Sequence, residues 1–400
     1  MSRFDGPHIK AREKEGTTFM ETRKHLGQDI SLLGFGMMRL PKIEADKPDI
    51  EEQHALDMID HAYQNGVTYY DTAWPYHSGL SEPFAARALS RYPRESFQLA
   101  TKLPTWLIES EADVDKYFEL QLERCGVEYF DFYLIHALSS DNWFRVGKHN
   151  IYEKLLKRKE QGQIRNIGFS FHDDVPMLRE IASAHPWDFA QIQLNYLDWE
   201  FQDAKTQYSI LAGKGIPVVI MEPIRGGSLV SLCPEGLSIL KEADATASPA
   251  SWAMRFAASL PGVLTVLSGM SHLDHVVDNV NTFRDFKPLS DDELRIVDRA
   301  VTAYRQAGAV PCTGCRYCME CPAGVDIPLV FGLYNDYKVS GSVGNLLNNF
   351  ELMGEAKQAK ACIACGACLP KCPQSIDIPA ELAKVQQVVE QLIAEKNKKD

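Results

Sequence analysis

Three short apolar segments lie close together in the chain: VTYYDTA at residues 67–73, FQLATK at 97–102 and YFDFYLIH at 129–136. Longer stretches that we expect to be helical, at 83–90 and 114–124, separate them. Apolar strands that are buried on both faces and separated by helices are typical of a parallel sheet. These segments therefore predict successive strand–helix units of one parallel sheet.

The same alternation continues in both directions. Residues 20–41 predict a hairpin followed by a buried strand near Leu32–Met38. Four further strands are expected at 164–170, 189–195, 216–223 and 263–269, each followed by a helix. Eight units over about 270 residues match the size of a closed (β/α)8 TIM barrel. An open doubly wound sheet is the alternative, but the first strand-to-helix turn lacks the GxGxxG pattern that such sheets often carry.

Composition excludes several classes of protein. The chain is 45% hydrophobic and 24% charged, as globular domains are, so it is not collagen-like or wholly disordered. Its net charge of −12 argues against nucleic acid or an anionic membrane surface as a main partner. No run approaches 18 apolar residues, and the first residues lack the apolar core of a signal peptide, so we expect a cytoplasmic protein that does not span a membrane.

Eight of the ten cysteines form two clusters near the C-terminus. The first run is Cys312, Cys315, Cys318 and Cys321, and the second is Cys362, Cys365, Cys368 and Cys372, each ending in Cys-Pro. The second run has the spacing of the bacterial [4Fe–4S] motif, and the first is one residue shorter before its last cysteine. Zinc bound by two CxxC pairs is the alternative, but it needs only four thiolates.

This C-terminal region resembles a dicluster ferredoxin domain with a helical insertion. The fourth ligand of each cluster in such modules comes from the other run. The resemblance therefore implies two [4Fe–4S] clusters, one held by Cys312, Cys315, Cys318 and Cys372 and the other by Cys362, Cys365, Cys368 and Cys321. We expect a loose extension at residues 1–19, the barrel at 20–305 and a small α-rich ferredoxin-like iron–sulfur domain at 306–400.

Polar groups follow the three strands quoted above. Asp71 ends the first and Tyr76 follows five residues later, Lys102 ends the second, and His136 ends the third. The carboxyl ends of barrel strands face the active site, so we expect these four groups to meet there. An ammonium beside a phenol favours the phenolate, so Lys102, held by Asp71, is expected to lower the pKa of Tyr76. None of the four can supply electrons, so a cofactor must.

The motifs GFGMMRLP, DTAxxY, the Lys of ATK, the His of LIH, IGFS and QIQLNY resemble those of the aldo/keto reductase family in order and spacing, over about residues 20–286. The resemblance implies a (β/α)8 barrel that binds NADPH or NADH and reduces the carbonyl group of a small molecule. It makes Tyr76 the proton donor, Lys102 and Asp71 the groups that tune it, and His136 the group that orients the substrate.

The resemblance also assigns nucleotide contacts. Ser170 and Gln191 match the residues that hold the nicotinamide carboxamide, and Met221 takes the place of the usual stacking aromatic. The residues that match those binding the adenosine end of the nucleotide are Gly269, Met270, Ser271 and Asn279. His275 replaces the arginine that often grips a 2′-phosphate, which leaves NADP and NAD both open; Arg225 or His272 could compensate.

Hydride carries two electrons, whereas an iron–sulfur cluster passes one at a time, and the sequence shows no flavin motif. Three hypotheses follow: clusters that relay electrons to or from a partner protein, clusters that are structural or redox-sensing, and a non-enzymatic electron-transfer protein. The intact set of four groups argues against the last. Trp74, Trp106, Trp143 and Phe144 are candidate apolar walls of the substrate pocket.

Overall fold

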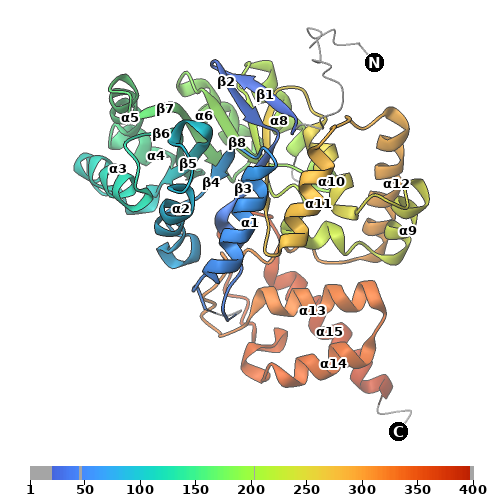
Figure 1. Ribbon diagram of the computed structural model, residues 1–400. Helices are drawn as coiled ribbons and strands as arrows, with labels where there is room; N and C mark the ends of the chain where they lie inside the picture. The colour runs from blue at the N-terminus through green and yellow to red at the C-terminus, as the bar shows by residue number, and fades with distance from the viewer. Residues whose placement is uncertain (1–19, 45–46, 202, 397–400) are drawn as a thin grey trace.

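A computed structural model describes residues 20–44, 47–201 and 203–396 of the chain. The extension expected at residues 1–19 lies outside the described residues. Within them, an eight-stranded barrel with surrounding helices is followed by a small helical module (Figure 1). None of the helices in the described ranges is both long enough and apolar enough to cross a bilayer.

The barrel is closed and parallel throughout, which confirms the barrel prediction and excludes the open sheet. Each strand pairs with the next in sequence, and the last pairs with the first. The strands are β3 (Leu33–Gly36), β4 (Tyr69–Asp71), β5 (Gln98–Leu103), β6 (Phe130–Leu138), β7 (Ile164–Phe171), β8 (Phe189–Gln193), β9 (Val218–Met221) and β10 (Val263–Gly269).

The helices follow the strands as expected. They are α1 (Glu52–Gln64), α2 (Ser81–Leu89), α3 (Glu111–Cys125), α5 (Ile151–Glu160), α6 (Val175–Ala184), α8 (Ala204–Gly213), α10 (Pro249–Ala258), α11 (Leu273–Phe283) and α12 (Asp291–Ala307). Ser290 and Glu293 form a capping box that fixes the start of α12. Three helices were not predicted: α4 (Trp143–Lys148) and α7 (Asp198–Phe201) are short, and α9 (Pro234–Ala243) follows a loop and packs on α12.

An antiparallel hairpin closes one end of the barrel. It consists of β1 (Thr22–His25) and β2 (Gln28–Ser31). Ile30 packs with the interior residues of the barrel, and His25 Nε2 lies 3.0 Å from Asn166 Oδ1. The hairpin lies at one end of the barrel and the helical module at the other (Figure 1). The open end, at the carboxyl ends of the strands, is therefore the one that faces the module.

The C-terminal module has a hydrophobic core of its own. Its helices are α13 (Ile327–Ser340), α14 (Val343–Leu352) and α15 (Ile378–Lys396), which lie together in Figure 1. Phe331, Phe350 and Val385 are among the buried residues that form this core. The core of the barrel extends to Tyr304, and that of the module begins at Val310.

Candidate active site and cluster loops

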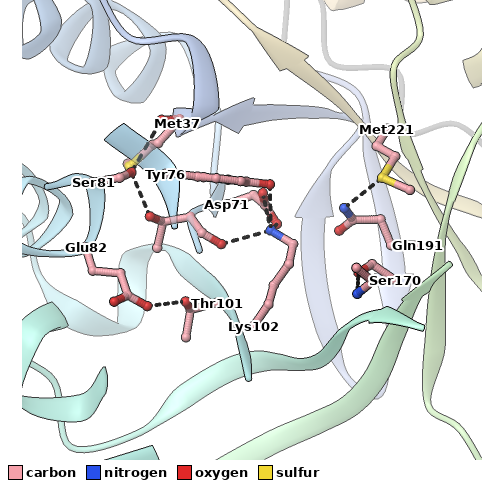
Figure 2. Close-up of polar contacts among 12 residues, drawn as sticks. Met37, Asp71, Tyr76, Ser81, Glu82, Thr101, Lys102, Ser170, Gln191 and Met221 are labelled. Carbon is pink, nitrogen blue, oxygen red and sulfur yellow. Dashed lines mark hydrogen bonds and ion pairs between the residues drawn. The ribbon is translucent and has the colours of Figure 1, made fainter. Parts of the chain in front are cut away.

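The four predicted polar groups meet at the open end of the barrel. Lys102 Nζ donates to both carboxylate oxygens of Asp71, at 2.7 and 2.8 Å, and to the carbonyl oxygen of Thr72 at 2.8 Å. The same ammonium lies 3.4 Å from the hydroxyl oxygen of Tyr76, and dashed lines in Figure 2 join it to both Tyr76 and Asp71. The ring of His136 packs edge-on against that of Tyr76, with centroids 6.4 Å apart. The site thus contains a paired ammonium and carboxylate, a phenol and an imidazole.

The barrel register explains why these groups converge. Asp71 lies opposite Ala100 on β5, and Lys102 lies opposite Leu134 on β6, so each side chain enters from a neighbouring strand. Lys102 and Asp71 are almost wholly buried, at 0% and 3% exposure. A buried charge is tolerated when it is paired and hydrogen-bonded, and removing one partner leaves the other uncompensated. The ion pair between Lys102 and Asp71 therefore fixes the positions of both side chains.

The pKa of Tyr76 is raised well above its ordinary value, opposite to the sequence prediction. Burial is the largest cause, and the negative charges of Asp71 and Glu222 add to it, while Arg39 opposes them. The sequence argument considered only the ammonium and could not include burial or Glu222, which comes from the far side of the barrel. The phenol is therefore protonated at neutral pH, a state in which it can donate a proton but cannot accept one.

The pKa of His136 is shifted well below its ordinary value. Burial is the main cause, and the charge of Lys102 adds to it. The imidazole is therefore neutral near pH 7, with one N–H to donate. Its buried Nδ1 has no hydrogen-bond partner among the described residues. His136 can thus orient an acceptor without adding a positive charge.

A cavity of about 310 Å³ runs from these groups to the segments expected to bind the nucleotide. Its lining includes Ser170, Gln191, Met221 and Asn279, together with residues 269–271. Gln191 Nε2 donates to Met221 Sδ at 3.3 Å, as Figure 2 shows, while its buried Oε1 has no partner in the described part of the chain. The structure thus brings every predicted nucleotide contact to one cavity.

Local contacts fix several of these side chains. Ser170 Oγ accepts from the backbone N–H of Ala137 at 2.7 Å. Asn279 Nδ2 donates to Ser268 Oγ at 2.9 Å, and Ser271 Oγ donates to the carbonyl oxygen of Arg39 at 2.7 Å. A Cβ at Gly269 would lie 3.1 Å from the Arg39 side chain, so a larger residue would crowd this wall. The free Gln191 oxygen and the tight loop fit an extended dinucleotide.

Several lining residues were not assigned a role from the sequence, although Arg39 and Gln193 stand within the quoted motifs GFGMMRLP and QIQLNY. Arg39 and Glu222 face each other with Nη2 and Oε1 3.7 Å apart, and His172 and Gln193 also line the cavity. Their place in the cavity wall follows only from the arrangement of the strands around the barrel. By contrast, none of the four predicted aromatic walls is among the described residues lining this cavity. Trp106 packs behind one lining residue, with its ring centroid 5.2 Å from that of His136.

Arg225 is not among the described residues that line this cavity. It is 1% exposed, and its Nε donates to both carboxylate oxygens of Asp198 at 3.0 Å. Its Nη2 donates to Gln374 Oε1 of the C-terminal module, also at 3.0 Å. Arg225 therefore joins the two parts of the chain.

The eight clustered cysteines surround two hollows in the module. The first is lined by Cys312, Cys315, Cys318 and Cys372, and the second by Cys318, Cys321, Cys362, Cys365 and Cys368. No three His, Cys, Asp or Glu side chains within the described ranges converge closely enough to share a single ion. Instead, the sulfurs line the walls of a space, an arrangement that fits a cluster with several irons.

The first cysteine loop also forms part of the cavity at the open end of the barrel. Cys315, Tyr317 and Pro373 lie in the same wall as Tyr76 and His136. The loop is held there by close contact, because a Cβ at Gly226 of the barrel would lie 2.3 Å from the carbonyl oxygen of Thr313. The module and the barrel thus enclose one cavity between them.

Comparisons with known proteins agree with this architecture. Residues 32–302 match the model of the aldo/keto reductase family, and residues 311–376 match that of a 4Fe-4S dicluster domain. A probable aldo-keto reductase 1 of Glycine max is 29% identical over 209 residues, 50% of this chain and 58% of that protein. An NADH-specific methylglyoxal reductase of Escherichia coli K12 is 27% identical over 217 residues, 50% of this chain and 65% of the relative.

This chain therefore covers less than two thirds of the length of either curated relative. Among solved structures, the aldo-keto reductase AKR11C1 from Bacillus halodurans has a TM-score of 0.59 at 24% identity, covering 70% of this chain and 96% of that one. That likeness concerns the fold. The family match spans more than half of the sequence, so this chain belongs to the aldo/keto reductase family and carries a 4Fe-4S dicluster domain after its barrel.

Proposed function

We propose that this protein reduces the carbonyl group of a small molecule with NAD(P)H, and that Tyr76 donates the proton. The contact between Lys102, Asp71 and Tyr76, in a cavity that also contains the predicted nucleotide residues, carries this proposal. The bound nicotinamide would supply the hydride that these side chains cannot.

Each group of the site has a distinct role in this proposal. Tyr76 stays protonated because of burial and nearby carboxylates, so its proton is available to the developing alkoxide. Lys102, fixed by Asp71, stabilises the phenolate that remains after the transfer. Neutral His136 donates a hydrogen bond that orients the carbonyl oxygen. The raised pKa favours reduction over the reverse oxidation, because oxidation begins with the phenolate.

We propose that NADH serves at least as well as NADPH. His275 lines the cavity where the adenosine end is expected, and burial lowers its pKa, so it is neutral near pH 7. Arg225 is engaged with Asp198, and Arg39, which lines the cavity, faces the carboxylate of Glu222. A 2′-phosphate would thus lack the charged partner that usually binds it. One curated relative is named an NADH-specific enzyme, which accords with this proposal.

We further propose two [4Fe–4S] clusters with the ligand sets implied by the sequence, in a module at residues 306–400. The two hollows support this partition, because each is lined by three cysteines of one run and the last cysteine of the other, with Cys318 bordering both hollows. When bound, each cluster would pass one electron, so the two together match the two electrons of a hydride. Cys315 in the cavity wall supports a relay between the site and a partner protein.

The test uses anaerobically purified protein with iron and labile sulfide measured. We expect about eight irons and eight sulfides per chain, NAD(P)H-dependent reduction of a simple aldehyde, and loss of that activity in Tyr76→Phe. Zinc without sulfide would refute the clusters, and undiminished activity in the variant would refute the proton donor. Bleaching of the cluster absorbance by NAD(P)H would support the relay, and clusters that never change redox state during turnover would favour a structural role.

A further inference from the structure

A second cavity adjoins the active site. It has a volume of about 530 Å³, larger than the 310 Å³ of the first. His172, Gln193, Tyr317 and Pro373 line both cavities, so they form the boundary between them. The second cavity is therefore the immediate neighbour of the place where the carbonyl would react.

The second cavity lies between the barrel and the iron–sulfur module. Its barrel side consists of residues at the ends of β6, β7 and β8 and near α8: Ala137, Ser139, Ser140, Asp141, residues 171–175, Gln193, Asp203 and Gln207. Its other side consists of Tyr317, residues 369–373, which include Cys372, and Ser375. A barrel without the module would lack this second side, so the cavity is a property of the two-part chain.

Acidic groups dominate the charge of this cavity. Asp141, Asp173, Asp174 and Asp203 line it, against Lys371 as the one lysine or arginine in the described lining. The pKa of His172 is lowered to about 4 by burial and by Lys102, so it adds no positive charge near pH 7. The cavity therefore has a net negative charge.

Two of these carboxylates, those of Asp173 and Asp174, accept hydrogen bonds from the backbone and stabilise the local fold. Asp173 accepts hydrogen bonds from the backbone N–H groups of Ser140 and Asp174, at 2.6 and 2.7 Å, and Asp174 caps α6. Asp141 and Asp203 have no polar partner among the described residues, and both are exposed to the cavity solvent. These two carboxylates are thus available to a ligand.

Two residues on the boundary between the cavities, Gln193 and Tyr317, can also form hydrogen bonds with a ligand. Gln193 is only 9% exposed and lines both cavities, and its side-chain amide has no hydrogen-bond partner among the described residues. Tyr317 stands beside it with a hydroxyl that likewise has no partner among described residues, on a side chain that is 44% exposed. An amide and a hydroxyl without protein partners can each bond to a ligand or to water in the cavity. Their position points to a polar ligand that passes between the cavities.

We propose that the substrate site extends past Gln193 and Tyr317 into this second cavity, which binds a positively charged group on a carbonyl substrate. The inference rests on the proposed carbonyl reduction, because it places the carbonyl carbon beside Tyr76. The substrate class is a carbonyl compound with an ammonium group several bonds from the reacting carbon. The iron–sulfur module thereby helps to select the substrate as well as to carry electrons.

Matched aldehydes test this inference. 4-(Trimethylammonio)butanal and 5,5-dimethylhexanal have nearly the same shape and differ by one charge, and 4-oxobutanoate bears the opposite charge. We expect kcat/KM for the cation to exceed that for the neutral aldehyde on the order of tenfold, with the anion lower still, because unit charges in a partly solvated cavity interact by this amount. The double variant Asp141→Asn/Asp203→Asn should reduce this preference to about twofold, through KM, and leave the neutral aldehyde unchanged.

The control is Asp291→Asn/Asp292→Asn, which changes the charge equally at exposed positions in the first turn of α12. It should keep the preference. Equal kcat/KM for cation and neutral aldehyde in the native protein, or a preference that survives the cavity variant, would overturn the inference. If no aldehyde is reduced, calorimetric binding of 4-(trimethylammonio)butan-1-ol decides independently: binding that depends on Asp141 and Asp203 supports the cavity while the proposed function fails, and its absence overturns both.

Discussion

Replacing Gly226 with alanine should separate the iron–sulfur module from the active site. Gly226 has a φ of +65°, in a loop against the first cysteine run, and a Cβ there would lie 2.3 Å from the carbonyl oxygen of Thr313. This distance is roughly 1 Å less than van der Waals contact. Because the obstacle is backbone, the module loop or the barrel loop must move by about that amount.

Gly227 provides the matched control. Its φ is +99°, but a Cβ there would meet nothing within 4 Å. Alanine at either position adopts a left-handed backbone at a cost of about 1–2 kcal/mol or more. Only Gly226→Ala adds the overlap, for which overpacking typically costs about 1–3 kcal/mol. Stability alone would not distinguish the two variants clearly, so position-specific measurements are needed.

The decisive assays report the position of the module. Since the displaced loop also contains Cys312 and Cys315, we expect Gly226→Ala to lower iron and sulfide content and to raise KM for bulky aldehydes. Gly227→Ala should keep native cluster content and native KM even if it unfolds at a lower denaturant concentration. Equal effects of the two substitutions on clusters and KM would refute the inference that this contact holds the loop in the cavity wall.

Three further predictions concern the site. Tyr76→Phe should lower kcat/KM by about 10²- to 10⁴-fold with unchanged cluster absorbance, as expected for a lost general acid, and a loss below tenfold would contradict that role. Because burial raises the pKa of Tyr76 and lowers that of His136, the pH profile of kcat/KM should be flat around neutrality. On the alkaline side, kcat/KM should fall only when the pH rises through the raised pKa of Tyr76. On the acidic side, it should fall only when the pH drops through the lowered pKa of His136, so a decrease in kcat/KM centred near pH 6.5 would contradict this prediction. His275→Arg should increase the preference for NADPH over NADH about tenfold, measured as a ratio of kcat/KM values, whereas His272→Arg, at a neighbour outside the described cavity lining, should not.

The sequence predicts the barrel because its strands are apolar on both faces and recur at regular intervals. The same regularity placed Asp71, Lys102 and His136 at strand ends, where neighbouring strands must bring them together. The helix α9 was not predicted, because it lies outside the repeating strand–helix unit and packs against α12.

The errors at the site have a different cause. Whether a phenol gains or loses acidity depends on burial and on every charge around it, and Glu222 reaches Tyr76 only across the folded barrel. Likewise, Arg225 looked available in sequence, but in the fold it is buried between Asp198 and Gln374. A sequence shows which groups exist, whereas long-range packing decides which are free.

The placement of the cysteines bears on what the clusters do. The module already has a hydrophobic core around Phe331 and Val385. Clusters that only stabilised the module would therefore not need a cysteine ligand in the wall of the proposed substrate cavity. Instead, Cys315 lies in the active-site wall, Cys318 borders both hollows, and Cys365 is exposed on the far hollow. This order, from the cavity through two adjoining hollows to the surface, is what stepwise electron transfer requires. This order fits the proposed relay, in which the cluster held near Cys315 would exchange electrons with the site and the one near Cys365 with a partner protein.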